Sequence, residues 1–288
     1  MKSDLMWQIR QEMSGLSKSQ KAIGRFILEH YEKAAYMTAA KLGEYAGVSE
    51  STVVRFAIEM GYDGYPALQE ALRDLVRTRL TAVQRMEITN DRIGNSHVLD
   101  RVLGDDMDRI RMTLESVDRD RFEQAVEMLC AARTVYIAGV RATSSLASFL
   151  YFNCNLIFPD VKLIATTSGN EIFEQMLHIG PQDVLIAISF PRYSKHMIDA
   201  AQYAASNGAH IVAVTDSLMS PIAEYAQCVL TAKSDMVSFI DSLVAPLSLL
   251  NALVVAIARK KQGELATAFE KLEKIWDAYE VYDKENER

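Results

Sequence analysis

Five short apolar runs in the second half of the chain constrain its fold more than any other feature. Each is about five residues long and nearly continuously apolar, and segments with helical periodicity separate them. The runs are TVYIAG, VKLIAT, DVLIAIS, HIVAVT and CVLTA. Strands that are apolar on both faces and alternate with helices are typical of parallel sheets covered on both sides. The sequence therefore predicts a doubly wound α/β domain with a parallel sheet, preceded by a helical pair at 99–117 and 121–131.

The first 80 residues show helical periodicity throughout. Residues 17–35, behind a Ser17 cap, and residues 38–46 each space apolar side chains at helical intervals, and a further helix follows Pro66, which suits a first helical turn. Polar residues then gather without strong periodicity. We expect an all-α domain over 1–80, a linker over 81–98 and the α/β domain over 99–288.

The stretch AGVSESTVVRF has the pattern of a helix, a tight turn and a second helix. Gly47 can take the positive φ that a sharp corner requires, and Ser49 can accept a backbone N–H as the N-cap of the second helix. Small residues at Gly43 and Gly47 permit a close approach of the two helices, and Val53 with Phe56 gives the second helix an inner face. A helix-turn-helix needs this packing, but a structural corner of two helices with no DNA-binding role has the same packing, so the pattern alone leaves both interpretations open.

The outward face of the second helix favours a contact with double-stranded DNA. It carries short hydroxyls, one carboxylate and one guanidinium, on Ser49, Glu50, Ser51, Thr52 and Arg55. A recognition helix presents its first residues to base edges in the major groove, where an arginine can bind guanine through two hydrogen bonds and a carboxylate can accept one from cytosine. We therefore expect these five residues to contact DNA.

Charge alone does not favour a nucleic-acid partner. The chain carries a net charge of −7, and residues 1–80 hold 11 Lys and Arg against 10 Asp and Glu. A chain of net negative charge is not attracted to the phosphates of DNA over long distances, so any electrostatic attraction must come from local contacts. A protein-interaction module is therefore the alternative for the helical domain.

Topology selects two loops of the α/β domain for ligand binding. Ligands of open parallel sheets lie beyond the carboxyl ends of the strands, where neighbouring crossovers leave in opposite directions. GVRATSS and SFPRYSK follow the first and third runs and open helices, whose N-termini favour anions. We expect a small anionic ligand to contact Gly139, Arg141, Thr143, Ser144, Ser189, Arg192, Tyr193 and Ser194.

The string MTAAKLGEYAGVSESTVVRFAIEMGYDGYPAL resembles the N-terminal domain of the RpiR family of bacterial transcriptional regulators, over about residues 5–80. Such proteins join a helix-turn-helix domain to a C-terminal sugar isomerase (SIS) domain, which residues 121–259 resemble in turn. The resemblance implies a strand order of 2-1-3-4-5 and two loops that bind phosphosugars. It places Thr143 at the hydroxyl of the first loop, and Ser189 and Ser194 at the phosphate-contacting hydroxyls of the second.

Both loops depart from the family pattern. Pro191 and Arg192 stand in place of a Ser and a Gly, and Arg141 stands where the first loop often has Gly. The added bulk argues against an unmodified phosphosugar pose. The two arginines can clamp a phosphate or carboxylate through paired hydrogen bonds. Alternatively, they form ion pairs within the loops, with acids such as Asp160 or Glu171.

An SIS fold also serves enzymes, so a sugar-phosphate isomerase or lyase with an accessory helical domain is the rival hypothesis. Isomerisation needs a base near the carbon-bound proton, and the candidates are Glu171, Glu174, His178 and His196. Helical faces carry such polar sets routinely, so we expect no enzyme. The five histidines lack metal-ligand spacing and no cofactor motif is present, so we expect no metal and no cofactor.

The N-terminus and the cysteines indicate a cytoplasmic protein. No apolar signal segment begins the chain, and its three cysteines are odd in number and widely spaced, which suits a reducing compartment. The most apolar run, residues 242–258, is interrupted by Pro246 and Asn251 and is shorter than the roughly 20 residues of a bilayer span. We expect a buried or interface helix there, and no membrane partner.

These features together predict a ligand-controlled regulator that binds its operator as a homodimer or tetramer. A palindromic operator requires two recognition helices about one helical turn apart, which one protomer does not supply. The surfaces available for pairing are the helix expected at 238–261 and a C-terminal helix with a stripe of Leu265, Phe269, Leu272 and Trp276.

Overall fold

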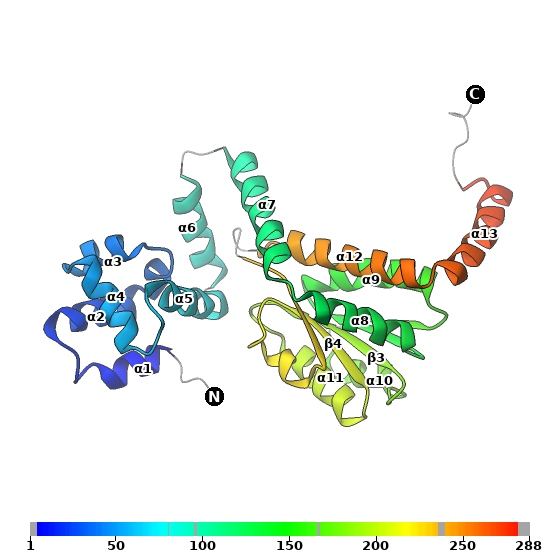
Figure 1. Ribbon diagram of the computed structural model, residues 1–288, viewed down its shortest axis with the longest axis horizontal. Coiled ribbons are helices and arrows are strands. Elements are labelled where there is room, and N and C mark those ends of the chain that lie inside the picture. The colour runs from blue at the N-terminus through cyan, green and yellow to red at the C-terminus, as the bar shows by residue number, and fades with distance from the viewer. Residues whose placement is uncertain (1–4, 80, 95–96, 166–167, 236–239, 282–288) are drawn as a thin grey trace. The chain divides into compact units, whose positions relative to one another are not determined.

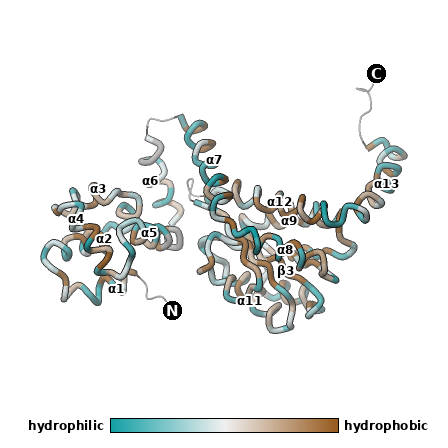
Figure 2. The backbone as a smooth tube through the Cα atoms, in the orientation of Figure 1, coloured by the Kyte–Doolittle hydropathy of each residue, from teal (hydrophilic) through white to brown (hydrophobic). Residues whose placement is uncertain are grey.

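The computed structural model describes residues 5–79, 81–94, 97–165, 168–235 and 240–281 (Figure 1). It divides into two compact units, one made of residues 1–96 with 236–240 and the other of residues 97–235 with 241–288. The first unit has one hydrophobic core, and the second has one on each face of its sheet. Hydrophobic segments, brown in Figure 2, run through both units.

The first unit is helical, as predicted. Its helices are α1 (Leu5–Glu12), α2 (Lys18–Ala34), α3 (Ala39–Ala46), α4 (Glu50–Glu59), α5 (Tyr65–Arg79) and α6 (Ala82–Ile93). Ser17 caps α2 as expected, in a capping box with Gln20. Ile23, Phe56 and Leu68 are fully buried in the shared core of α2, α4 and α5.

Helix α6 lies in the segment that the sequence suggested as a linker. Thr81 and Gln84 form a capping box at its start, with the Gln84 N–H 3.3 Å from Thr81 Oγ1. The face that α6 buries carries Arg85 and Thr89, whose hydroxyl donates to the Arg85 carbonyl at 2.9 Å. Because polar residues occupy this buried face, hydrophobic periodicity gives no sign of the helix.

The second unit contains a five-stranded parallel sheet. Its strands are β1 (Val135–Gly139), β2 (Val161–Ile164), β3 (Val184–Ile188), β4 (His210–Thr215) and β5 (Cys228–Thr231). Their order is β2-β1-β3-β4-β5, which confirms the predicted order and the doubly wound plan. Val135 pairs with Val161 on one side and with Val184 on the other, so the crossovers leave β1 and β3 in opposite directions.

Helices cover both faces of the sheet (Figure 1). Val135 and Ile137 face a core shared with α8 (Arg119–Ala131), α9 (Thr143–Ile157) and α12 (Val244–Lys260). Tyr136 and Ala138 face the opposite core, beneath α10 (Gly169–Gln175), α11 (Lys195–Ser206) and the 3₁₀ turn η1 (Pro221–Tyr225). This alternation explains why the strand sequences are apolar throughout.

Three further helices bear on the predictions for the second unit. Helix α7 (Val98–Ser116) precedes α8 and completes the predicted helical pair. Helix α12 begins at Val244, later than the predicted start at Ser238, which lies outside the described residues; the Ser242 hydroxyl accepts a hydrogen bond from the Val244 N–H at 3.4 Å. Helix α13 (Gln262–Ala278) contains no buried residue, and none of the described helices is long and apolar enough to cross a membrane.

Candidate functional site

The turn between α3 and α4 depends on two glycines. Gly47 ends α3 with φ 68° and ψ 36°, the left-handed conformation expected from the sequence. The Val48 N–H donates to the Gly43 carbonyl at 2.8 Å, and a Cβ added at Gly43 would lie 2.8 Å from the Val48 carbonyl oxygen. Gly43 therefore permits the turn to close against α3, and this fixes the direction in which α4 leaves.

Helix α4 packs one face into the core and leaves its first turn outside. Val53, Phe56 and Ala57 are fully buried, which confirms the predicted inner face. The residues expected to contact DNA lie on the other side: Ser49, Glu50, Ser51 and Arg55 are exposed, and Thr52 is half-buried. The polar surface of α4 is therefore open within this unit.

The hydroxyls at the start of α4 bond to one another. Ser49 Oγ lies 2.9 Å from Ser51 Oγ and 2.8 Å from Thr52 Oγ1, and Arg55 Nε donates to the Ser51 carbonyl at 3.3 Å. Ser49 is the N-cap residue of α4, as predicted, but its side chain does not accept the backbone N–H that the sequence analysis expected. Its hydroxyl is instead part of a small surface cluster of donors and acceptors.

A cavity of about 190 Å³ lies beyond the carboxyl ends of β1 and β3, at the predicted place in the topology. Five of the eight residues expected to contact the ligand line it: Arg141, Thr143, Ser189, Arg192 and Ser194. Val140, Ala142, Phe190, Pro191, Asp241 and Leu243 complete the lining. Asp241 and Leu243 come from the segment after β5, which sequence analysis did not connect with the two loops.

The three hydroxyls in the lining have different roles. Thr143 Oγ1 lies within hydrogen-bond distance of two carbonyl oxygens, that of Val140 at 2.9 Å and that of Ile188 at 3.2 Å, and so ties the first loop to the end of β3. The hydroxyls of Ser189 and Ser194 form no hydrogen bond with any residue that the structure describes, although Ser194 is the N-cap of α11. Two cavity hydroxyls are thus available to a ligand.

Arg141 and Arg192 both adopt the left-handed backbone conformation, with φ of 58° and 65°. That conformation costs a residue with a Cβ roughly 1–2 kcal/mol, which is why glycine normally occupies such positions. Neither arginine forms an ion pair with a described residue, so the alternative of ion pairs with Asp160 or Glu171 is wrong. Strained residues held in this way cluster at ligand sites.

Three expected contact residues do not line the cavity. A Cβ on Gly139 would lie 2.6 Å from the Thr143 carbonyl oxygen, so this glycine allows α9 to approach β1 closely. The Ser144 hydroxyl donates to the Arg141 carbonyl at 2.6 Å, and the Tyr193 hydroxyl donates to Asp216 Oδ1 at 2.8 Å. These contacts shape the two loops.

The cavity lining holds one carboxylate, that of Asp241, and none of the bases that the sequence offered for catalysis. The four candidate bases, Glu171, Glu174, His178 and His196, are exposed and do not line the cavity. Within the described ranges, no group of three or more His, Cys, Asp or Glu residues is placed to hold a metal ion.

Comparison with known families agrees with both halves of the structure. The model described as "Helix-turn-helix domain, rpiR family" matches residues 3–78, and that of the SIS domain matches residues 128–256. The chain belongs to the RpiR family of regulators. Its second unit, with the five-stranded parallel sheet, is therefore the SIS domain, and the exposed start of α4 lies in the helix-turn-helix domain.

The relatives of this RpiR-family chain are HTH-type transcriptional regulators, and the match covers most of their length. The uncharacterized HTH-type transcriptional regulator YfhH of Escherichia coli K12 is 26% identical over 211 residues, which cover 72% of this chain and 74% of YfhH. HexR, an HTH-type transcriptional regulator of Pseudomonas aeruginosa, is 24% identical over 265 residues, which cover 90% of each chain.

Two solved structures share the fold. NanR of Vibrio vulnificus, complexed with ManNAc-6P, superposes with a TM-score of 0.60 at 21% identity and covers 96% of this chain and 98% of its own. The sugar isomerase domain of an RpiR transcription factor from Sphaerobacter thermophilus is 26% identical, with a TM-score of 0.58, and covers 60% of this chain and 97% of its own.

Proposed function

We propose that this protein is a transcriptional regulator that binds an operator through α4 and senses a sugar phosphate or a related anionic metabolite in the cavity of its SIS domain. The observation that carries the proposal is the cavity at the ends of β1 and β3, where two strained arginines lie with two uncommitted hydroxyls. A helix-turn-helix in the same chain gives the sensor a DNA-binding output.

The chemistry of the cavity suits a phosphate group. Guanidinium groups bind phosphate oxygens with paired, charge-assisted hydrogen bonds, and Ser189 and Ser194 add hydroxyl donors. Helices α9 and α11 both begin at this cavity, and the unpaired N–H groups of their first turns favour negative charge. The complex of NanR with ManNAc-6P supports a phosphosugar as the ligand class.

The chemistry of α4 suits DNA. Its hydroxyl cluster can bond phosphates or base edges, and the Arg55 guanidinium, held by Nε on the Ser51 carbonyl, keeps its terminal nitrogens for a guanine. We further propose that two copies act together, because a palindromic operator presents two half-sites about one helical turn apart.

Sensing without catalysis fits the lining of the cavity. Isomerisation would require a base within hydrogen-bond reach of a sugar carbon; the four candidate bases lie outside the lining, and Asp241 is the one carboxylate within it. The ligand in this proposal is therefore an effector that shifts operator affinity through a difference in its affinity for two arrangements of the protein.

Thermal unfolding of the full chain with a panel of hexose 6-phosphates and the corresponding free sugars tests the sensor. We expect at least one phosphate to raise the melting temperature, and the double variant Arg192→Ala with Ser194→Ala to abolish that rise. Ser206→Ala is the matched control, because Ser206 lies at the far end of α11, where its hydroxyl donates to the Tyr203 carbonyl. A full response in the double variant would contradict the assignment of the cavity.

A further inference from the structure

Helix α7 is held to the second unit by polar contacts. Its two buried residues are Arg109 and Thr113, and none of its residues belongs to the hydrophobic core on either face of the sheet. Thr113 Oγ1 accepts a hydrogen bond from the Lys233 N–H at 2.9 Å. Hydrogen bonds depend steeply on distance and angle, whereas apolar packing does not. The position of α7 therefore depends on the particular groups that it bonds.

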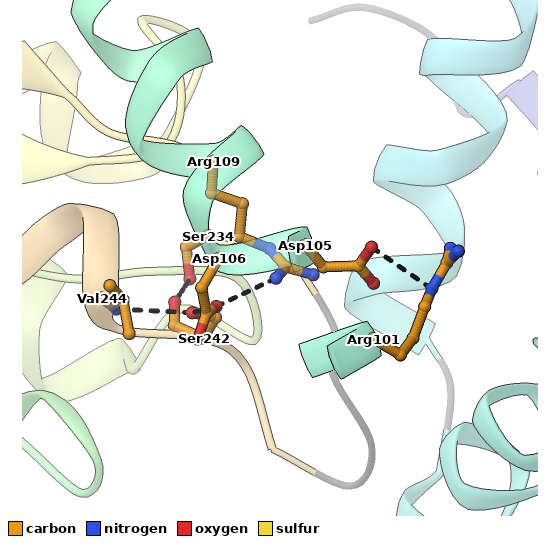
Figure 3. Close-up of polar contacts among 7 residues, drawn as sticks. All are labelled: Arg101, Asp105, Asp106, Arg109, Ser234, Ser242 and Val244. Atoms are coloured by element: carbon orange, nitrogen blue, oxygen red, sulfur yellow. Dashed lines mark hydrogen bonds and ion pairs between the residues drawn. The ribbon is translucent and has the colours of Figure 1, made fainter. Parts of the chain in front are cut away.

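These contacts join α7 to the segment that follows β5 (Figure 3). Ser242 of that segment donates its hydroxyl to Asp106 Oδ1 of α7 at 2.6 Å. The Ser242 carbonyl accepts a hydrogen bond from the Ser234 hydroxyl at 3.0 Å, and the Ser242 N–H donates to the Asp235 carbonyl at 2.9 Å. Ser242 is buried, so all its polar groups are committed to a network that ends on α7.

The two neighbours of Ser242 in the chain line the cavity of the SIS domain. Asp241 and Leu243 share that lining with Arg141 and Arg192. A molecule bound in the cavity would therefore contact the residues on both sides of Ser242. Because consecutive residues are joined by rigid planar peptide units, a shift of Asp241 or Leu243 also shifts Ser242.

The ion pair between Asp106 and Arg109 leaves hydrogen-bonding capacity unused. Arg109 Nη1 donates to Asp106 Oδ1 at 3.0 Å, the same oxygen that accepts the Ser242 hydroxyl, and the two side chains are 5% and 14% exposed. Among the residues that the structure describes, Arg109 Nε is buried without a hydrogen-bond partner and Asp106 Oδ2 accepts no hydrogen bond. An arginine and a carboxylate can instead join through two parallel hydrogen bonds, one to each oxygen.

Asp106 therefore has two arrangements of similar free energy. In the observed one, it accepts the Ser242 hydroxyl, and Arg109 Nε lacks a partner. In the other, Arg109 takes both carboxylate oxygens and the Ser242 hydroxyl is released. Each arrangement leaves one buried donor unsatisfied, and the two penalties are of the same order. A ligand that favours one arrangement can shift such a balance.

We infer that the hydrogen bond between Ser242 and Asp106 transmits occupation of the cavity to the DNA-binding unit. An anion bound in the cavity displaces residues 241–243, Asp106 pairs with Arg109 through both oxygens, and α7 loses this tie to the segment after β5. Helix α7 begins at Val98, directly after the helical unit ends at residue 96, so a shift of α7 moves the point at which that unit is attached. The inference rests on the proposed function and names the contact by which the cavity controls operator affinity.

The test is the affinity of the full chain for its own upstream duplex, with and without the hexose 6-phosphate that most raises the melting temperature. For the wild type we expect the phosphate to change this affinity by about 5- to 150-fold, the range typical of coupled sites. Ser242→Ala removes the hydroxyl that competes with Arg109. Without phosphate, this variant should bind the duplex as the saturated wild type does. It should also lose most of the response, while calorimetry shows phosphate bound at least as tightly as by the wild type.

Arg109→Lys should have the opposite effect. Lysine keeps the positive charge and one hydrogen bond to Asp106 but does not form the paired bonds, so it holds the observed arrangement. This variant should bind the duplex as the phosphate-free wild type does, and bind the phosphate more weakly. Damage to the fold would instead shift both variants in the same direction. Ser116→Ala is the matched control on α7, because the exposed Ser116 hydroxyl donates to the Met112 carbonyl of the same helix at 2.8 Å.

The inference is overturned if Ser242→Ala, with a native circular dichroism spectrum, responds to the phosphate as the wild type does. It is also overturned if Ser242→Ala and Arg109→Lys shift the duplex affinity in the same direction, or if the wild type binds phosphate and duplex without either affecting the other. If no hexose 6-phosphate binds the wild type, or if the duplex is not retained, the proposed function itself fails and the relay falls with it.

Discussion

Replacing Arg192 by glycine separates the backbone strain at this residue from the contact that we propose between its side chain and the ligand. Its φ of 65° costs a residue with a Cβ roughly 1–2 kcal/mol, and glycine gives back roughly 0.5–1 kcal/mol because it is freer in the unfolded chain. Arg192→Gly should therefore stabilise the protein by about 0.5–1 kcal/mol. Arg192→Ala keeps the strained Cβ and should leave stability almost unchanged, since the side chain is exposed and has no partner among the described residues.

Both variants lose the guanidinium, so both should bind the effector more weakly. One charge-assisted hydrogen-bonding group contributes about 1.5–3 kcal/mol, which corresponds to roughly 10- to 150-fold in affinity. Thermal unfolding would show Arg192→Gly melting about 1–4 °C above Arg192→Ala, and calorimetric titration with the responding sugar phosphate would show the same loss in both. A glycine variant less stable than the alanine variant, or wild-type affinity in either, would refute the reasoning.

Three further predictions follow from particular contacts. Gly43→Ala should destabilise the first unit by about 1–3 kcal/mol in urea denaturation, because its Cβ would lie 2.8 Å from a turn carbonyl, whereas Gly104→Ala in α7 meets no atom within 4 Å and should stabilise by up to about 1 kcal/mol. Burial alone would raise the pKa of the Asp183 carboxyl, but hydrogen bonds from Arg133 and from a backbone N–H outweigh burial and hold that pKa below the ordinary 3.8. The carboxylate therefore stabilises the fold above pH 3.8, and this stabilisation is lost as the pH falls through the lowered pKa. Asp183→Asn should lower the free energy of unfolding by about 1–3 kcal/mol at pH 7, and a variant that still loses as much stability in acid as the wild type, measured by urea denaturation, would contradict this. Burial raises the pKa of Cys154 to about 12, so its thiol should react with a disulfide reagent at pH 8 only after the protein unfolds. Mass spectrometry of the labelled protein, with and without denaturant, would show when Cys154 takes up the reagent.

The parallel sheet and the helix-turn-helix were predictable because their signals are local. Continuous apolar runs between helical segments indicated strands buried on both faces, and Gly47 marked the turn before α4. Helix α6 was not predictable in this way, because the face it buries includes Arg85 and Thr89. Hydrophobic periodicity detects a buried face only where that face is apolar.

The composition of the cavity was only partly predictable. Topology selected the two loops, but Asp241 reaches the cavity from a segment far along the chain, and such contacts leave no local pattern. The hydroxyl of Thr143 was expected at the ligand and instead bonds to backbone carbonyls. Helix α7 exposes Leu103, Met107 and Leu114 at helical spacing, and this sequence pattern is the same as that of a helix that faces a core, so only the structure distinguishes the two.

The most direct test of the account is the discrimination of the full chain between its own upstream duplex and a scrambled duplex, measured by fluorescence anisotropy over a range of salt concentrations. Arg55→Ala should lose about 1–3 kcal/mol of that discrimination if Arg55 reads a base. Arg25→Ala, which removes the same exposed charge from α2, should change the affinity for both duplexes alike. Equal discrimination by the wild type and Arg55→Ala would contradict the assignment of α4 as the element that reads DNA.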